Sequence, residues 1–362
     1  MPIPYENKEE ELLKFVINQV DESKAYQQPR IEQVREYTKR YEAKRSISGL
    51  LGWGDDPKRN PKDSPWEGCA DVGIPIDAFT IEGLLPRFLK VCYGSKPIVW
   101  VRGTGQSDIP NAPTVQEALN YQLTRMIKIY RRMKLIFKTV VMEGDGFAKC
   151  VWEKKTRPFN KVVYYLRDPL TQQLILDGNN KPIEVKSDFI PQADSNTGVA
   201  PELFKDEIQD EKVIYEGPMI YGRTIKELII PKNAISPEID EWDWICDTYE
   251  VTFDWLARKE GEIKEGKFKN LEKIKEDLLA KASDHNKAMR EPILIYEWYG
   301  KYDINGDDKD EELVVFISPK YKVLLGRMLS PFAVRPFFHY QIIPMEGRAF
   351  GKGVPEFLLG LR

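Results

Sequence analysis

Hydrophobic side chains recur at helical spacing over residues 114–142, and this is the clearest pattern in the chain. The apolar positions fall three or four residues apart, as they do on one face of an α-helix. They are Leu119, Leu123, Met126, Ile129, Tyr130, Met133, Ile136, Phe137 and Val140. The pattern predicts one continuous amphipathic helix, about 40 Å long at 1.5 Å per residue. We expect its apolar stripe to be buried against the body of the protein.

The opposite face of this helix is basic. It carries Arg125, Lys128, Arg131, Arg132, Lys134 and Lys138, with no acidic residue among them. A charged helix face of this kind is typical of a surface in contact with solvent, and the acidic run at 202–211 would balance its charge. The alternative is a surface that faces a neighbouring subunit or DNA.

Two further helices are predicted near the amino terminus. Residues 7–24 place apolar side chains on one face, and residues 29–45 continue at helical spacing. Pro29 would lie in the first turn of the second helix, where proline is tolerated. Residues 48–65 are rich in Gly, Pro, Asp, Asn and Lys without periodicity, which predicts an exposed loop.

Residues 64–97 contain an apolar helix with unusually many glycines and prolines. Pro86 interrupts the helix, and Gly94 closes it before a short strand that starts at Ile98. Taken one at a time, Pro86 is best explained as a kink in a core helix and Gly94 as a helix cap.

The second half of the chain has shorter apolar runs that predict strands. Residues 147–154 and 159–168 are expected to pair with each other, and residues 168–212 are polar and irregular enough to be an insertion. Further strands are expected at 212–230 and 243–251, and several between 292 and 344. A short helix that ends near Leu256 and a charged helix at 266–282 separate them. The fold class is therefore α+β, with long amphipathic helices packed on short, mostly antiparallel strands.

The composition of the chain disfavours several classes of protein. The chain has 362 residues, of which 42% are hydrophobic and 31% charged, so it is long enough and apolar enough to fold around a sizeable core. Its net charge of −3 provides no global positive field for gripping phosphate groups. The acidic amino terminus does not resemble a secretory signal, and no apolar run approaches the roughly 20 residues of a membrane span. The four cysteines have no metal-binding or disulfide spacing.

Two segments resemble ligand-binding loops without meeting their requirements. GRAFGKGVPE (347–356) has three residues between Gly347 and Gly351-Lys352, whereas a phosphate-binding Walker loop needs four and then Ser or Thr. DINGDDKDEE (303–312) begins like a calcium loop but has Asp308 where Gly is needed and Val314 where a bidentate Glu is needed. A structural turn and an acidic hairpin tip are the favoured interpretations. With only His285 and His339 present, a histidine metal site is also disfavoured, and we predict no catalytic residue, cofactor or metal.

Four blocks of sequence, in this order, resemble tailed-bacteriophage portal proteins, in particular the amino-terminal part of that family. The first is SPWEGCADVGIPIDAFTIEGLLPRFLKVCYGSKPIVWVRG (64–103), followed by VQEALNYQLTRM (115–126) and EGDGFAKCVWEK (143–154). The last comprises ILIYEWYGKYDINGDDKDEELVVFI and RPFFHYQIIPMEGRAFGKGVPEFL, which end at residue 358. The four blocks occur in the same order as in that family.

The resemblance implies a subunit of a ring, usually of twelve copies, at one capsid vertex of the virion, assembled in the host cytoplasm. Double-stranded DNA would pass through the ring without sequence-specific binding. The implied partners are the major capsid protein and scaffold, the terminase large subunit, and adaptor or tail connector proteins. Structural or interface candidates are Trp66, Gly68, Pro86, Gly94, Arg125, Lys128, Arg131, Arg132, Gly351, Gly353 and Pro355. A metal-dependent nucleic-acid enzyme that uses clustered carboxylates such as Asp303 and Asp307 is the alternative.

The resemblance also implies a division of the chain. Residues 1–63 would form a helical segment with an exposed loop, and 64–353 the wing-like body that contains the polar insertion at about 168–212. Residues 354–362 would begin a stem helix, because Pro355 and Glu356 suit a helix start and apolar residues follow. We expect the rest of the stem, the clip and the crown to belong to sequence outside these 362 residues.

Overall fold

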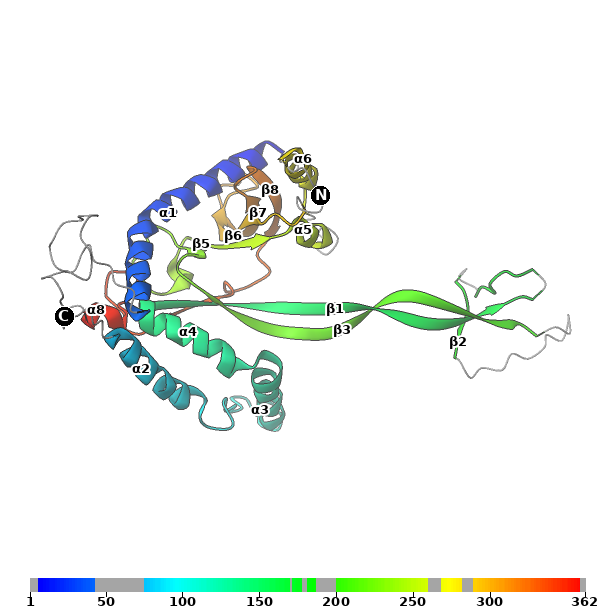
Figure 1. Cartoon of the computed structure of the whole chain (residues 1–362), viewed down its shortest axis with the longest axis horizontal. Helices are drawn as coiled ribbons and strands as arrows, with labels where there is room; N and C mark the ends of the chain where they lie inside the picture. The colour runs from blue at the N-terminus through cyan, green and yellow to red at the C-terminus, as the bar shows by residue number, and fades with distance from the viewer. Residues whose placement is uncertain are drawn as a thin grey trace, which may run out of the picture. The chain divides into compact units, whose positions relative to one another are not determined.

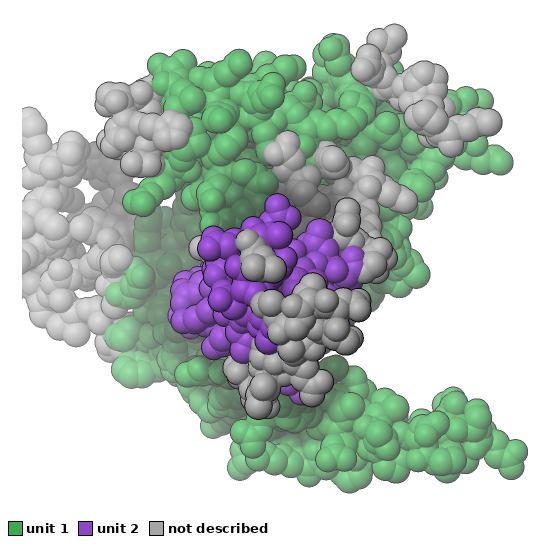
Figure 2. All heavy atoms as spheres, turned by 90° about the vertical axis from the view of Figure 1, so that its right-hand side faces the viewer, with its two compact units in different colours: residues 1–151, 220–362 green, residues 152–219 purple. Residues whose placement is uncertain are grey.

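The computed structural model describes residues 6–42, 75–169, 171–177, 181–186, 200–259, 268–281 and 289–358. The chain forms two compact units, one of Met1–Val151 with Ile220–Arg362 and one of Trp152–Met219 (Figure 2). Helices and antiparallel sheets are both prominent, which confirms the α+β class. The predicted loop at 48–65, Trp66 and Gly68 lie outside the described residues, and the predicted division of the chain stays a prediction.

The amino-terminal region is one helix and not two. Helix α1 (Glu6–Tyr41) continues through Pro29, which contradicts the prediction of a helix start there. Proline lacks the N–H that would bond the carbonyl of Ala25, and such a gap bends a helix without ending it when packing supports both halves. Figure 1 shows α1 bending along its length. Leu12, Val16 and Val20 are fully buried, so tertiary packing holds the amino-terminal half in place.

Helix α2 (Ile76–Tyr93) likewise runs through Pro86 and ends at Gly94. The Gly94 N–H bonds the Lys90 carbonyl at 2.9 Å, which confirms that Gly94 is the cap. The strand predicted at Ile98 is absent. The N–H groups of Ile98 and Val99 instead donate to the Asn120 side chain, at 2.7 and 3.2 Å. The Asn120 side chain therefore satisfies the backbone N–H groups that a neighbouring strand would otherwise satisfy. The spacing of hydrophobic residues does not show such a contact.

The helix predicted at 114–142 is broken into three parts. They are α3 (Ala112–Tyr121), a π-helical turn η2 (Gln122–Ile127) and α4 (Ile129–Glu143). Lys128 between them has a left-handed backbone, with φ of 56°. The change of direction divides the stripe: Met133, Ile136 and Val140 are buried, whereas Leu119 and Tyr130 are exposed. The prediction of one continuous stripe is wrong, because Leu119 and Tyr130 are exposed, and it is confirmed for Ile129, Met133, Ile136 and Val140 of α4.

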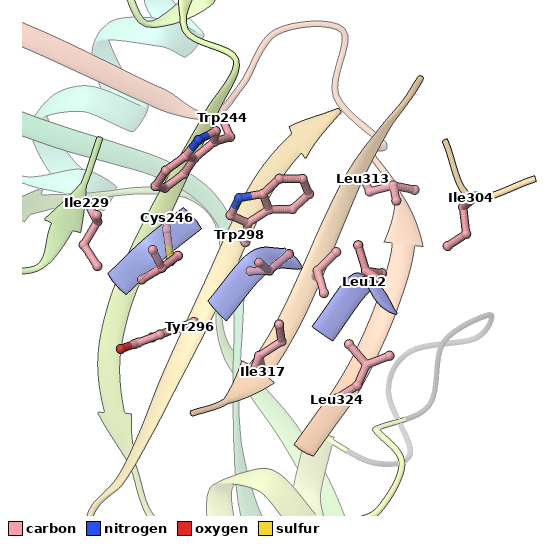
Figure 3. Packing of buried hydrophobic residues seen from close by; sticks show 13 residues of the cluster. Leu12, Ile229, Trp244, Cys246, Tyr296, Trp298, Ile304, Leu313, Ile317 and Leu324 are labelled. Carbon is pink, nitrogen blue, oxygen red and sulfur yellow. The ribbon is translucent and has the colours of Figure 1, made fainter. Parts of the chain in front are cut away.

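A five-stranded antiparallel sheet lies beside α1. Its order is β4 (Leu228–Ile229), β5 (Trp244–Val251), β6 (Ile293–Tyr302), β7 (Glu311–Ser318) and β8 (Val323–Leu329). Leu12 of α1 packs over this sheet with Trp244 and Trp298 (Figure 3). Helices α5 (Phe253–Lys259) and α6 (Leu271–Lys281) contribute a second cluster on the same strands. A 3₁₀ turn, η3 (Ile239–Glu241), precedes β5.

The other sheet is built on two long strands, β1 (Asp145–Arg167) and β3 (Glu202–Arg223). Residues 147–154 and 159–168 were predicted to pair with each other, and this is wrong, because both belong to β1. Strand β1 pairs with β3, with the short β2 (Glu184–Val185), and at its beginning with β9 (Phe337–Gln341). Both runs have strand composition, and no turn separates them, so the sequence did not show that they form one strand.

The acidic segment between β6 and β7 is a hairpin tip, as predicted. Both carboxylate oxygens of Asp303 accept backbone N–H groups, from Gly306 at 2.5 Å and from Asp308 at 3.2 Å. The last described element is α8 (Val354–Leu358), a helix start at the predicted position, and residues 359–362 lie outside the described part. None of the described helices is long and apolar enough to cross a bilayer.

Candidate functional site

Asp145 is the centre of a buried polar junction within the larger compact unit. It is the first residue of β1, follows the left-handed Gly144, and is 1% exposed. Its Oδ1 accepts hydrogen bonds from three donors that are distant in sequence. They are Nε2 of His339 at 3.0 Å, Nε2 of Gln341 at 2.9 Å and the N–H of Gly351 at 2.9 Å. A buried carboxylate needs such donors, because burying it without them is strongly unfavourable.

Arg30 contacts the same junction from α1. One guanidinium nitrogen bonds Glu356 of α8 at 2.7 Å, and the other bonds the carbonyls of Glu143 at 2.6 Å and Gly351 at 2.8 Å. Its ion pair with Asp145 is longer, at 3.4 Å. Burial alone would lower the pKa of Arg30, but the hydrogen bond to Glu356 and the charges of Asp145 and Glu356 outweigh it and raise the pKa. Arg30 is thus a fixed cation that joins α1 to α8.

His339 of β9 completes the hydrogen bonding around Asp145. Its ring stacks on Phe147 with 4.4 Å between centroids and 11° between planes. Nδ1 lies 2.9 Å from the carbonyl oxygen of Pro237, and Nε2 faces Asp145. Both neighbours are acceptors, so the ring satisfies both when each nitrogen carries a proton.

Three glycines let the backbones meet at this junction. A Cβ on Gly144, whose φ is +93°, would lie 2.6 Å from the N of Gly353 and 2.8 Å from the O of Gly351. A Cβ on Gly351 would lie 2.8 Å from the carbonyl oxygen of Ile343, and one on Gly353 would lie 2.6 Å from that of Met142. Any side chain at these positions would collide with main-chain atoms. Gly351 and Gly353 of GRAFGKGVPE therefore serve close backbone packing near the turn after α4, which agrees with a structural turn and not a phosphate loop.

Glu143, the last residue of α4, lies beside the same charges. Burial raises its pKa to about 7, against the opposing charges of Lys226 and Arg30, and the nearby Asp145 adds to the rise. Its Oε2 is buried and has no hydrogen-bond partner. A neutral carboxyl group suits this position better than a carboxylate.

A second buried charge cluster joins the two sheets of the larger unit. Nζ of Lys149 on β1 bonds Asp247 of β5 at 3.0 Å and Glu297 of β6 at 2.7 Å. Arg223 adds an ion pair to Asp247 at 2.9 Å, and the Tyr299 hydroxyl donates to Glu297 at 2.5 Å. Two cations and two anions balance one another. Any packing of the strands that separated these groups would leave a buried charge without a partner, which is strongly unfavourable. The cluster therefore favours this one packing of the strands.

The arrangement holds distant segments together and has no evident reactive group. Asp145 and its partners bring together α1, the end of α4, β1, β9 and the segment before α8. Among the residues that the structure describes, no group of three or more His, Cys, Asp or Glu side chains could hold a metal ion.

The structure places three of the sequence-predicted residues at this junction: Gly351, Gly353 and the buried Pro355. Pro86 and Gly94 lie elsewhere, within and at the end of α2. Sequence reasoning placed Glu356 at a helix start and discounted His339 as a metal ligand, but it did not predict the contacts of either. It did not single out Arg30, Asp145 or Gln341 at all. The one available signal was an aspartate between two glycines in EGDG, a polar residue where the chain turns sharply into a strand.

The basic residues of the broken helix have different environments. Arg125, Lys128 and Arg131 are exposed. Arg132 is half-buried, donates to the Ile220 carbonyl at 2.9 Å and lies over the Tyr221 ring. Lys138 pairs with Glu82 of α2 at 2.8 Å. The basic face predicted from the sequence is therefore partly used within the fold, and an interface role for the rest stays a prediction.

The comparisons identify the class to which this scaffold belongs, that of phage portal proteins. A family model described as the phage SU10 portal protein matches residues 12–359, nearly the whole chain. The chain therefore belongs to this family, and the resemblance seen in the sequence is confirmed. A comparison with curated proteins gave no match.

Proposed function

We propose that the protein is a subunit of a homo-oligomeric portal ring at one capsid vertex. Double-stranded DNA enters through this ring during packaging and leaves through it during ejection. The outer parts of the ring dock the terminase large subunit and later the adaptor or tail connector proteins, and its capsid side meets the major capsid protein and scaffold. The observation that carries the proposal is the family match over residues 12–359.

The physical chemistry of the chain supports a conduit. A ring through which DNA slides must not bind phosphate strongly, because each neutralised phosphate adds affinity that would hold the DNA. The net charge of −3 is compatible with this requirement. A ring subunit must also keep its shape under load, and the buried ion pairs around Asp145 and Lys149 stabilise the packing of distant segments.

Electron microscopy of the purified full chain tests the proposal. We expect negative-stain class averages that show closed rings with a central channel, about twelve-fold symmetric. Light scattering after gel filtration should give the mass of the same assembly. A chain that remains monomeric at all concentrations, with or without scaffold protein, would contradict the proposal.

The nuclease alternative can be tested on the same preparation. The candidate metal ligand of this alternative is Asp303. Its two carboxylate oxygens accept backbone N–H groups in the hairpin tip and so stabilise the loop. We expect no cleavage when the protein is incubated with DNA and magnesium or manganese. Metal-dependent cleavage that Asp303→Asn abolishes would establish the alternative.

A further inference from the structure

Helices α2 and α4 expose an apolar and basic surface, which we call the α2–α4 face. On α2, Phe79 is 70% exposed and lies one turn from Glu82, away from the buried Ile81 and Leu85. On α4, Leu135 is 69% exposed. Large apolar side chains gathered in this way are uncommon on a surface that meets only water, and they mark contact sites.

The parts of the α2–α4 face are contiguous. The ion pair between Lys138 and Glu82 links the two helices at 2.8 Å, and Leu135 lies one turn from Lys138 on α4. The hydrogen bond from Lys138 and the charge of Lys134 lower the pKa of Glu82, so Lys134 also lies on this side. With Glu82 paired, the remaining exposed charges of the two helices are positive: Arg87, Lys90, Arg131 and Lys134.

A second surface combines apolar side chains with the opposite charge, and we call it the hairpin face. Leu329, Phe332 and Val334, at and after the end of β8, are 65%, 46% and 60% exposed. They lie next to the acidic hairpin tip, because Leu329 pairs with Leu313 and the Ser330 N–H donates to the Glu312 carbonyl at 2.8 Å. The tip exposes three acids, Asp307, Asp308 and Asp310, and one base, Lys309, so its net charge is negative.

We propose that the hairpin face of one copy docks on the α2–α4 face of the next copy. This inference rests on the proposed ring and names the surfaces that form it. Each face has exposed apolar residues, and the two carry opposite charge, so the apolar areas can be buried while the charges pair at the rim. Two different faces that meet head to tail generate a ring when the rotation closes, whereas one self-complementary face gives only a dimer. DNA is a poorer occupant, since it would use the basic face and leave the acidic hairpin face uncovered.

Charge reversal tests this contact. One variant carries Arg131→Glu with Lys134→Glu, and the other carries Asp307→Lys with Asp310→Lys. Each alone places like charges across the contact, and we expect its half-assembly concentration to rise about tenfold or more. When the two variants are mixed, every contact again joins opposite charges, so we expect rings in which the variants alternate. Lys273→Glu with Lys275→Glu on α6 changes the net charge as the Arg131 and Lys134 variant does, but outside both faces, and should assemble like the parent.

Cross-linking gives an independent measurement that does not depend on the charge variants folding. Copies with Leu135→Cys are mixed with copies carrying Val334→Cys, both in a Cys92→Ser background, and oxidised mildly. We expect cross-linked dimers in the mixture and none from either variant alone.

The outcomes separate this inference from the proposed function. If the parent forms rings while both charge variants assemble normally and the cysteine mixture does not cross-link, the proposed contact between the two faces is contradicted. The proposed ring is then still supported. If the parent itself never forms a ring, both proposals are contradicted. Charge variants that assemble poorly alone but are restored on mixing would support both.

Discussion

Gly144 and Gly353 meet through their main chains: a Cβ on Gly144 would lie 2.6 Å from the amide nitrogen of Gly353. Contact this close is possible only where neither residue has a side chain. The pair joins the turn between α4 and β1 to the segment that enters α8. Two segments about 200 positions apart in sequence are thereby packed backbone to backbone beside Asp145, whose carboxylate accepts the N–H of Gly351.

Gly144→Ala should therefore be strongly destabilising. The left-handed backbone and the collision with Gly353 act together, and we expect a loss of about 2–4 kcal/mol in the free energy of unfolding. Gly347→Ala is the matched control, since its φ is +72° but an added Cβ would meet nothing within 4 Å. Its loss should be only about 1 kcal/mol. Equal losses in denaturant unfolding would mean that the close contact contributes nothing.

The sequence predicts the type of most elements but not how they connect. Over α4 and β5–β8, local periodicity and burial agree, so the elements predicted from the pattern are present. The strand predicted at 212–230 is wrong in its bounds, because β3 begins at Glu202, within the segment expected to be irregular, and ends at Arg223 before the short β4. The errors at Pro29, Ile98 and Lys128 share another cause. In each case tertiary contacts override or replace a local signal, such as the Asn120 amide that satisfies Ile98.

The contacts of the polar junction around Asp145 could not be predicted from the sequence. Arg30, Asp145 and His339 come from three distant segments, and a single sequence does not show that they meet. Gly351 and Gly353 were marked as candidates because of their residue type, but their reason is geometric: other backbones lie where their Cβ atoms would be. The family resemblance located the right blocks without assigning a contact to any residue in them.

Met133→Asp tests the burial of the α4 stripe. Met133 is 4% exposed and packs with Ile129, Ile136 and Ala148, so an aspartate would bring an unpaired charge into the core. We expect a loss of roughly 4 kcal/mol or failure to fold. Val115→Asp, a 45% exposed position on α3, is the control and should melt within a few degrees of the parent. A Met133→Asp protein that melts with the parent would show that the stripe is not buried in solution.

The hairpin tip at 303–310 should be stable without calcium. A ligand that binds only the folded state raises the melting temperature, so a calcium site would show as a shift on adding millimolar calcium. We expect none, because the Asp303 oxygens already accept two N–H groups and Asp308 and Val314 occupy the positions where a calcium loop needs Gly and Glu. Asp303→Asn should lower the melting temperature slightly, equally with calcium and with chelator. A rise of several degrees that Asp303→Asn removes would establish a metal site.

Glu143 should make stability depend on pH in a direction opposite to that of most carboxylates. Its pKa in the folded protein is about 7, raised chiefly by burial from an ordinary value near 4.5. Between these two values the folded state holds a proton that the unfolded state releases. The contribution of this group to stability is therefore fully present below about pH 4.5 and is lost as the pH rises to about 7.

Replacing Glu143 with glutamine removes this dependence, because the amide stays neutral. Relative to the parent, we expect Glu143→Gln to gain about 2–3 kcal/mol in unfolding free energy between pH 4.5 and pH 8. The comparison with the parent at each pH cancels the titration of other groups that the substitution does not perturb. Glu117→Gln, at an exposed position on α3, serves as the control and should show the same difference from the parent at every pH. A Glu143→Gln difference that does not change with pH would mean that Glu143 is ionised at neutral pH in the folded protein, and that the charges of Lys226 and Arg30 compensate for its burial.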